Sequence, residues 1–508
     1  MTLRRPAWPL LLLLVLLLLS TGIKLIHLRA DAPQLFPNGF ASSAPVKDEA
    51  AKSYEARNRA LFGHWTASPA DDYRYWNTLS PAWTHSLMLW FKLFGVSYPS
   101  LRLFSILWSV LAVLIVWRFF PSSQHPAAGP LAATLYALNF YLLIFGRLGL
   151  IETALNTLIL LGLAILIRAM ARPRLFPLAA AIFYLAFLCK QSAAAFFPLL
   201  ALAAILAPAG QRRTAWLSIL VLFTASAALF LWPDYWLRSI MNLRHALGWR
   251  PDVTHQWMLF EFPVTRQALA QAFGSIGFLQ GYLLMMPVAG PLALLEIIVF
   301  CSRGLKTRAW DRSELLLVAA LLCARLVLAL SPHAVVRFYL IQFPPACLLA
   351  GLLLQRILFA AADRISAGNR RLAVASLIAL ALLFDLVPYL RWLRDPAYQI
   401  QEASQALQKA VGPGPAVLIG EWAAPLGLET PYRTFYVKNI FNRRPEQLRQ
   451  FGITHLLFSD PDQDPAIKSF RQTFPGPFEQ RQLLLAFPLF DETLTLYRVQ
   501  TSPPGAWP

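Results

Sequence analysis

The sequence predicts a polytopic α-helical membrane protein with a small α/β domain at its C-terminal end. Of its 508 residues, 57% are hydrophobic and only 14% are charged, whereas soluble domains contain about 25% charged residues. Apolar runs of roughly 20 residues, long enough to cross a bilayer, recur throughout residues 1–391. Residues 392–508 instead contain short alternating runs that are typical of strands. We therefore expect a transmembrane domain followed by a soluble one.

The first apolar run covers residues 7–27 and follows Arg4 and Arg5. Its length is that of a membrane span, so we expect an uncleaved transmembrane helix. Alternatively, Ala30 and Ala32 mark a signal-peptide cleavage site of the small-x-small type. Both alternatives place residues 28–80 on the outer side of the membrane.

Later apolar runs give about eleven spans when the first run is included. They lie near residues 99–119, 127–145, 151–169, 175–190, 191–208, 214–232, 276–300, 314–331, 334–356 and 371–391. Lys190 separates two contiguous runs. Because a charge is costly inside a bilayer, we expect Lys190 at a turn or beside a polar cavity.

Basic residues mark the predicted cytoplasmic side. With the N-terminus inside, alternate connections carry the positive charges that the positive-inside rule requires. They are Arg168, Arg172, Arg174, Arg212, Arg213, Arg303, Lys306, Arg308, Arg312, Arg364, Arg370 and Arg371. Much of the net charge of +19 is therefore topological and does not indicate a nucleic-acid partner. An odd number of spans places the C-terminus outside, as expected for a multi-pass protein of the cytoplasmic (inner) membrane.

The predicted outer, periplasmic side holds the loop 28–98, a short turn at Gly146–Leu150, the loop 233–275 and the tail 392–508. The tail contains a strand-like run at Ala416–Gly420, a helix-then-strand pattern at Pro445–Ser459, and alternating runs near residues 482–487 and 493–499. We expect these to form a small α/β domain on the outer membrane face.

The loop 233–275 is rich in tryptophan and tyrosine. One interpretation is an aromatic belt at the membrane interface. The alternative is a lid or platform over a sugar, with His255 and Trp257 as its candidate substrate contacts. The pattern does not choose between the two.

Adjacent carboxylates, Asp48 and Glu49, begin a run with helical spacing in the first outer loop. A solvated loop helix explains them if Glu49 or Glu55 pairs with a nearby cation. Further polar residues lie where the topology predicts the outer ends of spans: Arg147, Glu152, Lys190 and Arg337. Each also has a structural explanation, as an ion pair, a snorkelling cation or a lipid anchor.

Taken together, these residues provide the parts for a displacement at a phosphorylated carbon. Cations can hold a phosphate, and arginine can do so through two parallel hydrogen bonds. A carboxylate beside them can take the proton from an incoming hydroxyl. The cations can also stabilise the charge on a phosphate leaving group.

We expect no metal or other cofactor, since no His/Asp cluster has ligand spacing. A divalent ion is compatible with the sequence if Asp48, Glu49 and Glu152 converge on it. The cysteines, which lie in or beside apolar runs without a CxxC pair, indicate neither a disulfide framework nor a metal site. They are Cys189, Cys301, Cys323 and Cys347.

The order of these motifs resembles that of the GT-C class of membrane glycosyltransferases, in particular the branch with the protein O-mannosyltransferases and the lipid A aminoarabinose transferase. The resemblance covers residues 1–360 in ordered motifs and the tail in general character. Its matching elements are Asp48-Glu49, Tyr54, Gly63-His64-Trp65, Ser80-Pro81, Leu93-Phe94-Gly95, Arg102, Arg147 with Glu152, Phe187-Leu188-Cys189-Lys190-Gln191, and Arg337-Phe338-Tyr339 with Pro344.

The resemblance implies an inverting transfer of a sugar from a polyprenyl-phosphate donor to a hydroxyl of a protein or glycolipid acceptor. Asp48 would be the general base, and Glu152 would assist or position. Glu49 is either a further catalytic carboxylate or only orients the loop. Donor phosphate would be bound by Lys190, Arg337 and Arg147, and Tyr54 and Tyr339 would contact substrate. The sugar and the acceptor stay open.

The sequence also departs from the pattern of this class. The usual Lys-Pro-Pro-Leu-Tyr-Tyr phrase is replaced by residues 79–84, Leu-Ser-Pro-Ala-Trp-Thr, so a lysine and two aromatic residues are missing. Gln191 replaces a glycine, and Phe338 separates Arg337 from Tyr339. These changes bear on the identity of donor and acceptor.

Two other functions are alternatives to the enzyme. A flippase or transporter of lipid-linked sugars would show matching halves with broken helices, and the sequence shows no internal repeat. A non-enzymatic membrane scaffold would leave the acidic pair without a role.

Overall fold

The structure is a computed structural model. It describes residues 8–33, 43–68, 70–71, 73, 76–120, 125–230, 279–329, 336–359, 366–436, 442, 450–459, 472, 475 and 481–499. The aromatic loop 233–275, with the predicted contacts His255 and Trp257, lies outside the described residues.

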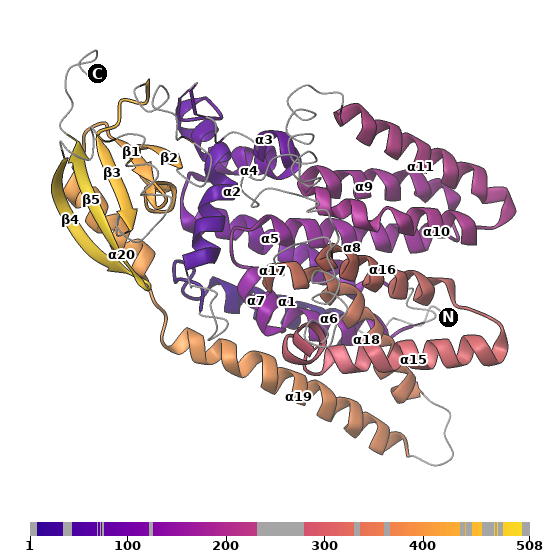
Figure 1. Cartoon of the computed structure of the whole chain (residues 1–508). Helices are drawn as coiled ribbons and strands as arrows, with labels where there is room; N and C mark the ends of the chain where they lie inside the picture. Colours follow the sequence, from indigo (N-terminus) through magenta and orange to yellow (C-terminus); the bar gives the residue numbers. More distant parts are fainter. Residues whose placement is uncertain are drawn as a thin grey trace.

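The chain forms a bundle of long helices with a β-sheet at one end (Figure 1). We call this the sheet end of the bundle. The helices of the bundle are α1 (Trp8–Leu25), α4 (Pro81–Phe94), α5 (Tyr98–Trp117), α6 (Ala128–Ala137), α7 (Phe140–Phe145), α8 (Ile151–Ala169), α9 (Phe176–Cys189), α10 (Pro198–Leu206), α11 (Ala209–Phe230), α15 (Ala289–Thr307), α16 (Arg312–Ala329), α18 (Phe343–Phe359) and α19 (Ala367–Arg394).

Several described segments are long and apolar enough to cross a membrane. They are Tyr98–Trp117, Ile151–Ala169, Val336–Phe359 and the run Ala367–Val411. Shorter apolar helices accompany them, and large apolar side chains are exposed along α1 and α11, for example Leu18 and Val221. Exposed leucine and valine on a long helix suit a lipid environment. The total of about eleven spans stays a prediction.

The structure confirms the break that Lys190 predicts. Helix α9 ends at Cys189, Lys190 is extended, and a 3₁₀ helix (Gln191–Phe196) leads into α10. The predicted span 127–145 is instead two helices, because the Asn139 side chain accepts hydrogen bonds from the backbone N–H groups of Tyr141 and Leu142 and so begins α7.

The predicted span near 276–300 begins later, because a π-helix (Leu279–Leu284) precedes α15. Helix α4 lies within residues that we expected to be an outer loop. Pro81 occupies its first turn, where the missing N–H costs nothing.

Helix α2 (Ser43–Phe62), which carries the acidic pair, lies between the bundle and the sheet (Figure 1). Arg57 fixes it to the C-terminal segment, donating hydrogen bonds of 2.8–2.9 Å to four backbone carbonyls. These belong to Gly427, Leu428, Thr430 and Tyr432. The C-terminal segment therefore holds α2 in place.

The sheet has the strand order β2-β1-β3-β5-β4. Its strands are β1 (Val417–Gly420), β2 (Arg433–Tyr436), β3 (His455–Ser459), β4 (Arg481–Leu489) and β5 (Glu492–Val499), accompanied by α20 (Gln399–Val411) and α21 (Ala423–Gly427). Strand β1 pairs in parallel with β2 and β3, and β5 pairs antiparallel with β3 and β4.

Four of the strands confirm the runs predicted from sequence, whereas β2 was not predicted. Gly420 ends β1 with a φ of +147°, and a Cβ there would lie 1.8 Å from the Leu457 carbonyl oxygen. Only glycine permits this close approach of β1 to β3.

Candidate active site at the sheet end of the bundle

Glu152 is the centre of a cluster of charged side chains. It lies in the first turn of α8, where the helix dipole favours a carboxylate. Its side chain is only 4% exposed, and its oxygens contact three cations from other elements. Lys190 Nζ lies 2.8 Å from Oε1, and Arg337 Nε lies 3.3 Å from the same atom. Lys52 Nζ lies 3.1 Å from both oxygens.

Asp48 lies at the more accessible edge of this cluster. It comes from α2, and its Oδ2 accepts a hydrogen bond from Arg337 Nη1. The side chain of Asp48 is 23% exposed, against 4% for Glu152. Of the two carboxylates, Asp48 is the one that a second reactant can reach.

An aromatic ring supports the two accessible cations. Lys190 Nζ lies 4.3 Å from the centroid of the Phe338 ring, and the Arg337 guanidinium carbon lies 5.2 Å from it. Both distances allow a cation–π attraction. Phe338, which interrupts the motif of the class, thus has a place at the site, on α17 (Val336–Tyr339).

We refer to Asp48, Glu152, Lys52, Lys190 and Arg337 as the cationic cluster. It contains three positive and two negative side chains, which leaves one positive charge in excess. A buried or half-buried excess of charge is costly unless a ligand of the opposite charge is bound. The cluster is therefore suited to an anion.

Lys52 is the member that the sequence analysis missed. It follows Asp48 by four residues, so both side chains lie on the same face of α2. Burial lowers the pKa of Lys52 to about 8, although the nearby Glu152 carboxylate acts in the opposite direction. The i, i+4 spacing was the available signal, but its partner Glu152 lies 100 residues away.

Glu49 lies outside the cationic cluster, and its predicted catalytic role stays a prediction. Arg102 on α5 holds it through two hydrogen bonds, Nε to Oε1 at 3.0 Å and Nη2 to Oε2 at 2.8 Å. The Gly149 N–H also donates to Oε1, at 2.6 Å. Glu49 is completely buried. Glu49 thus joins α2 to α5 and to the turn before α8.

Arg147 is likewise placed elsewhere than predicted. It donates hydrogen bonds to the carbonyls of Ile26 and His27, and its guanidinium carbon lies 4.6 Å from the centroid of the Trp392 ring. Within the described residues, the ion pairs of Glu152 are with the three cations of the cluster. Arg147 therefore joins α1 and α19 to the bundle, and its contact with the donor phosphate stays a prediction.

Both tyrosines predicted to contact substrate are buried. The Tyr54 hydroxyl lies 2.7 Å from Asp71 Oδ2 and 2.5 Å from the Thr434 carbonyl, and so connects α2 to β2. Tyr339 is 1% exposed and packs beside Gly281 of the π-helix. A substrate contact for Tyr54 and Tyr339 stays a prediction.

The carboxylates that could share a metal ion do not converge, because Glu49 turns toward Arg102 while Asp48 and Glu152 face cations. Among the described residues, no group of three His, Cys, Asp or Glu side chains is arranged to hold a metal ion.

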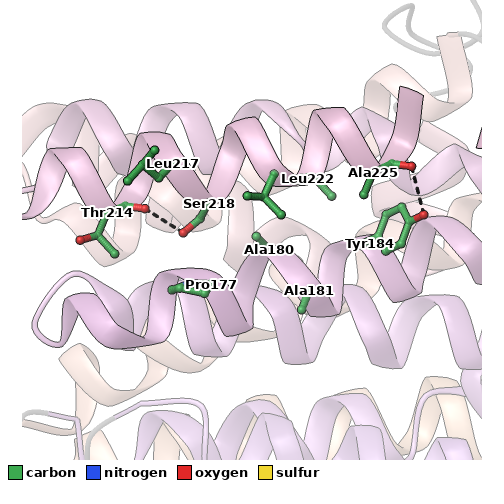
Figure 2. A pocket seen from close by; sticks show the side chains of 10 residues that line it. Pro177, Ala180, Ala181, Tyr184, Thr214, Leu217, Ser218, Leu222 and Ala225 are labelled. Carbon is green, nitrogen blue, oxygen red and sulfur yellow. Dashed lines mark hydrogen bonds between the residues drawn. The ribbon is translucent and has the colours of Figure 1, made fainter. Parts of the chain in front are cut away.

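A separate apolar cavity of about 430 Å³ lies between α9 and α11 (Figure 2). The Tyr184 hydroxyl donates a hydrogen bond to the Ala225 carbonyl at one end, and the Ser218 hydroxyl donates to the Thr214 carbonyl at the other. No member of the cationic cluster lines it. Apart from Tyr184, Thr214 and Ser218, its lining is apolar and suits hydrocarbon.

Comparisons with known proteins place this geometry in context. Residues 78–236 match the family model described as dolichyl-phosphate-mannose-protein mannosyltransferase. A search of curated protein sequences gives no significant match.

Among solved structures, the chain is similar to ArnT from Cupriavidus metallidurans bound to undecaprenyl phosphate. The TM-score is 0.61 at 13% identity, over 97% of this chain and 98% of that one. It is also similar to the archaeal oligosaccharyltransferase AglB from Archaeoglobus fulgidus, solved with an inhibitory peptide and a dolichol-phosphate. Here the TM-score is 0.53 at 13% identity, over 92% of this chain and 71% of that one. At these identities the similarity shows the fold.

The family model over residues 78–236 and the shared fold agree with the resemblance drawn from the sequence: the chain has the fold of the GT-C membrane glycosyltransferases.

Proposed function

We propose that this protein transfers a sugar from a polyprenyl-phosphate donor to an acceptor hydroxyl at the outer face of the cytoplasmic membrane. The nature of the donor is supported by two structures of the same fold, which were solved with undecaprenyl phosphate and with dolichol-phosphate. Both ligands are phosphates on long isoprenoid chains, and the cationic cluster of this chain is suited to such a phosphate.

One observation carries the proposal. Asp48 is a partly exposed carboxylate that pairs with Arg337. Both belong to the cationic cluster, which has one positive charge in excess. A base and an anion site are thus adjacent. A displacement at a phosphorylated carbon needs a base and an anion site close together.

In the proposed reaction, Asp48 accepts the proton of the acceptor hydroxyl while the hydroxyl oxygen attacks the anomeric carbon. A new glycosidic C–O bond forms as the bond between that carbon and the phosphate oxygen breaks. The phosphate leaves with the electron pair of the broken bond. A single displacement of this kind inverts the anomeric configuration.

Lys190 and Arg337 would stabilise the charge that gathers on the leaving phosphate. Both are about one-fifth exposed, so they can reach a donor that enters beside Asp48. Electrostatic stabilisation by one preorganised donor group is commonly worth about 10²–10³ in rate. Glu152, which is buried between the cations, would hold them in place without touching the reacting atoms.

The acceptor would be a protein or glycolipid hydroxyl. Mass spectrometry of glycolipids and glycoproteins from cells with and without this chain identifies both the sugar and the acceptor. Loss of one glycosylated species in the cells that lack the chain is the expected result. Identical profiles would contradict the proposed transfer.

The catalytic base is tested with Asp48→Asn, which removes the carboxylate at nearly constant volume. We expect sugar transfer from a labelled polyprenyl-phosphate sugar in proteoliposomes to fall by about 10²–10⁴-fold, the usual value of a general base. The melting temperature of the variant should match that of the wild type. Near-normal turnover by Asp48→Asn would remove Asp48 from the mechanism.

A further inference from the structure

We infer that Lys52 is a positioning residue that supplies the excess positive charge with which the cationic cluster attracts the donor phosphate. This inference rests on the proposed function and adds a residue to it. Lys52 is too deeply buried to touch the donor itself, since its side chain is only 5% exposed.

The geometry shows what Lys52 does within the cluster. Its ammonium group lies 3.1 Å from each oxygen of Glu152 and so contacts both of them equally. The contacts of Lys190 and Arg337 at 2.8 Å and 3.3 Å are with Oε1 of Glu152. Lys52 therefore occupies the inner side of the carboxylate and leaves the two accessible cations at its outer side.

The charges show why this matters. With Lys52, the cluster has three cations and two carboxylates and an excess of one positive charge. Without Lys52, two cations would face two carboxylates, and the cluster would be neutral. Asp48 and Glu152 would then satisfy Arg337 and Lys190 completely, and an anionic donor would gain little by binding.

The surroundings of Lys52 hold it in this position. The Trp83 indole N–H donates a hydrogen bond of 3.2 Å to the Lys52 carbonyl oxygen. Trp83 belongs to α4, which thus packs against the turn of α2 that carries Lys52.

The test measures binding of undecaprenyl phosphate to the full-length protein in detergent, so that the identity of the sugar is not needed. Lys52→Gln should raise the Kd roughly 10- to 50-fold. This is the effect expected when one charge is removed several ångströms from the ligand in a partly buried site. Lys47→Gln is the matched control. Lys47 lies on the same helix but pairs with Glu421 and Glu492, so its removal should leave the Kd unchanged.

The double variant Lys52→Gln/Glu152→Gln separates the effect of the lost charge from the effect of the lost Lys52 side chain. It keeps Asp48, Lys190 and Arg337 and therefore restores the excess of one positive charge. We expect it to bind more tightly than Lys52→Gln but less tightly than the wild type, because Glu152 no longer holds Lys190 and Arg337 in place. If Lys52→Gln binds as the wild type does, or if the double variant binds no better than the single one, the inference is overturned.

The wild-type protein provides a readout that does not depend on any variant folding. Burial lowers the pKa of Lys52 to about 8, so the excess charge should be lost as the pH rises through that value. The charged or titratable groups that face Lys52 are Glu152, Arg337, Asp48, Lys190 and Cys189. Binding of undecaprenyl phosphate should weaken between about pH 7 and pH 9, roughly tenfold or more, and this change should be absent in the double variant.

A constant Kd across that pH range in the wild type would overturn the inference. These results are distinguishable from failure of the proposed function. A wild-type protein that neither binds undecaprenyl phosphate nor transfers sugar contradicts the proposed function itself, whereas normal transfer with a normal Lys52→Gln variant contradicts only the role of Lys52.

Discussion

Asp48 and Glu49 are neighbours on α2, yet they belong to two different kinds of ion pair. Glu49 and Arg102 form a closed, buried pair with two parallel hydrogen bonds, and the remaining arginine donors reach the carbonyls of Leu28 and Ala30. Asp48 belongs to the cationic cluster, which is partly exposed and has an excess of positive charge. The charges of the Glu49–Arg102 pair cancel, whereas those of the cluster that contains Asp48 do not.

The difference separates stability from function. A buried ion pair whose donors and acceptors are all hydrogen-bonded has no group free to bind a ligand. Removing one partner leaves an uncompensated charge in the interior. An accessible cluster with unbalanced charge gains from a ligand of the opposite sign. Exposure and charge balance thus distinguish two carboxylates that look alike in the sequence.

The largest effect on stability should come from breaking the balanced pair. In Glu49→Gln the Arg102 charge stays buried without its carboxylate, which typically costs about 3–5 kcal/mol. The melting temperature in detergent should fall clearly, whereas Asp48→Asn should leave it unchanged. If Asp48→Asn were the more destabilising of the two, the comparison would be wrong.

Substitutions of Arg337 test whether the cationic cluster stabilises the phosphate leaving group. Arg337→Gln should lower kcat/KM for the polyprenyl-phosphate sugar by about 10²-fold, since one preorganised donor to the phosphate is lost. Arg337→Lys should recover only part of this loss, because lysine cannot bridge Asp48 and Glu152 with a planar fork. Full recovery by lysine would show that the charge alone matters.

A third carboxylate, Asp71, should make stability depend on pH. Burial raises its pKa to about 6 in the folded protein. The folded state then holds the proton more tightly than the unfolded chain, so stability is greatest below about pH 4 and declines as the pH rises through 6, by roughly 2–3 kcal/mol. Melting temperatures from pH 4 to pH 8 measure this decline. Asp71→Asn should reduce it, and an equally steep decline in that variant would exclude Asp71 as its source.

The smallest effect is expected for Tyr54→Phe. Its hydroxyl joins α2 to Asp71 and to the Thr434 carbonyl, and losing these contacts should cost about 1–3 kcal/mol of stability, because buried partners are left unsatisfied. The donor KM should not change, since Tyr54 is buried away from the cationic cluster. An increased donor KM at unchanged stability would return Tyr54 to the substrate site.

Much of the architecture could be predicted from local sequence. Apolar length predicted α5, α8 and α19, and a lysine inside an apolar run predicted the break after α9. Alternating patterns predicted most of the strands, because a strand that is buried on one face has a period of two. Helix α4 was not predicted, because the polar residues in its first turns resemble a loop.

The site was harder to predict, because its members come from distant parts of the chain. Sidedness and the resemblance to the GT-C class grouped Asp48, Glu152, Lys190 and Arg337, and the structure does bring these four together. The same reasoning included Glu49 and Arg147, which lie elsewhere, and omitted Lys52. Nothing in the local sequence shows which of several nearby charges share a contact.

The sequence by itself thus determined the fold class, most of the apolar helices and the stretches that carry the polar residues, because hydrophobic length and periodicity are local properties. Only the tertiary structure decided which carboxylate meets which cation. Successive residues on an α-helix point about 100° apart, so Asp48 and Glu49 face different neighbours. Those neighbours are set by how α2 packs between the bundle and the sheet.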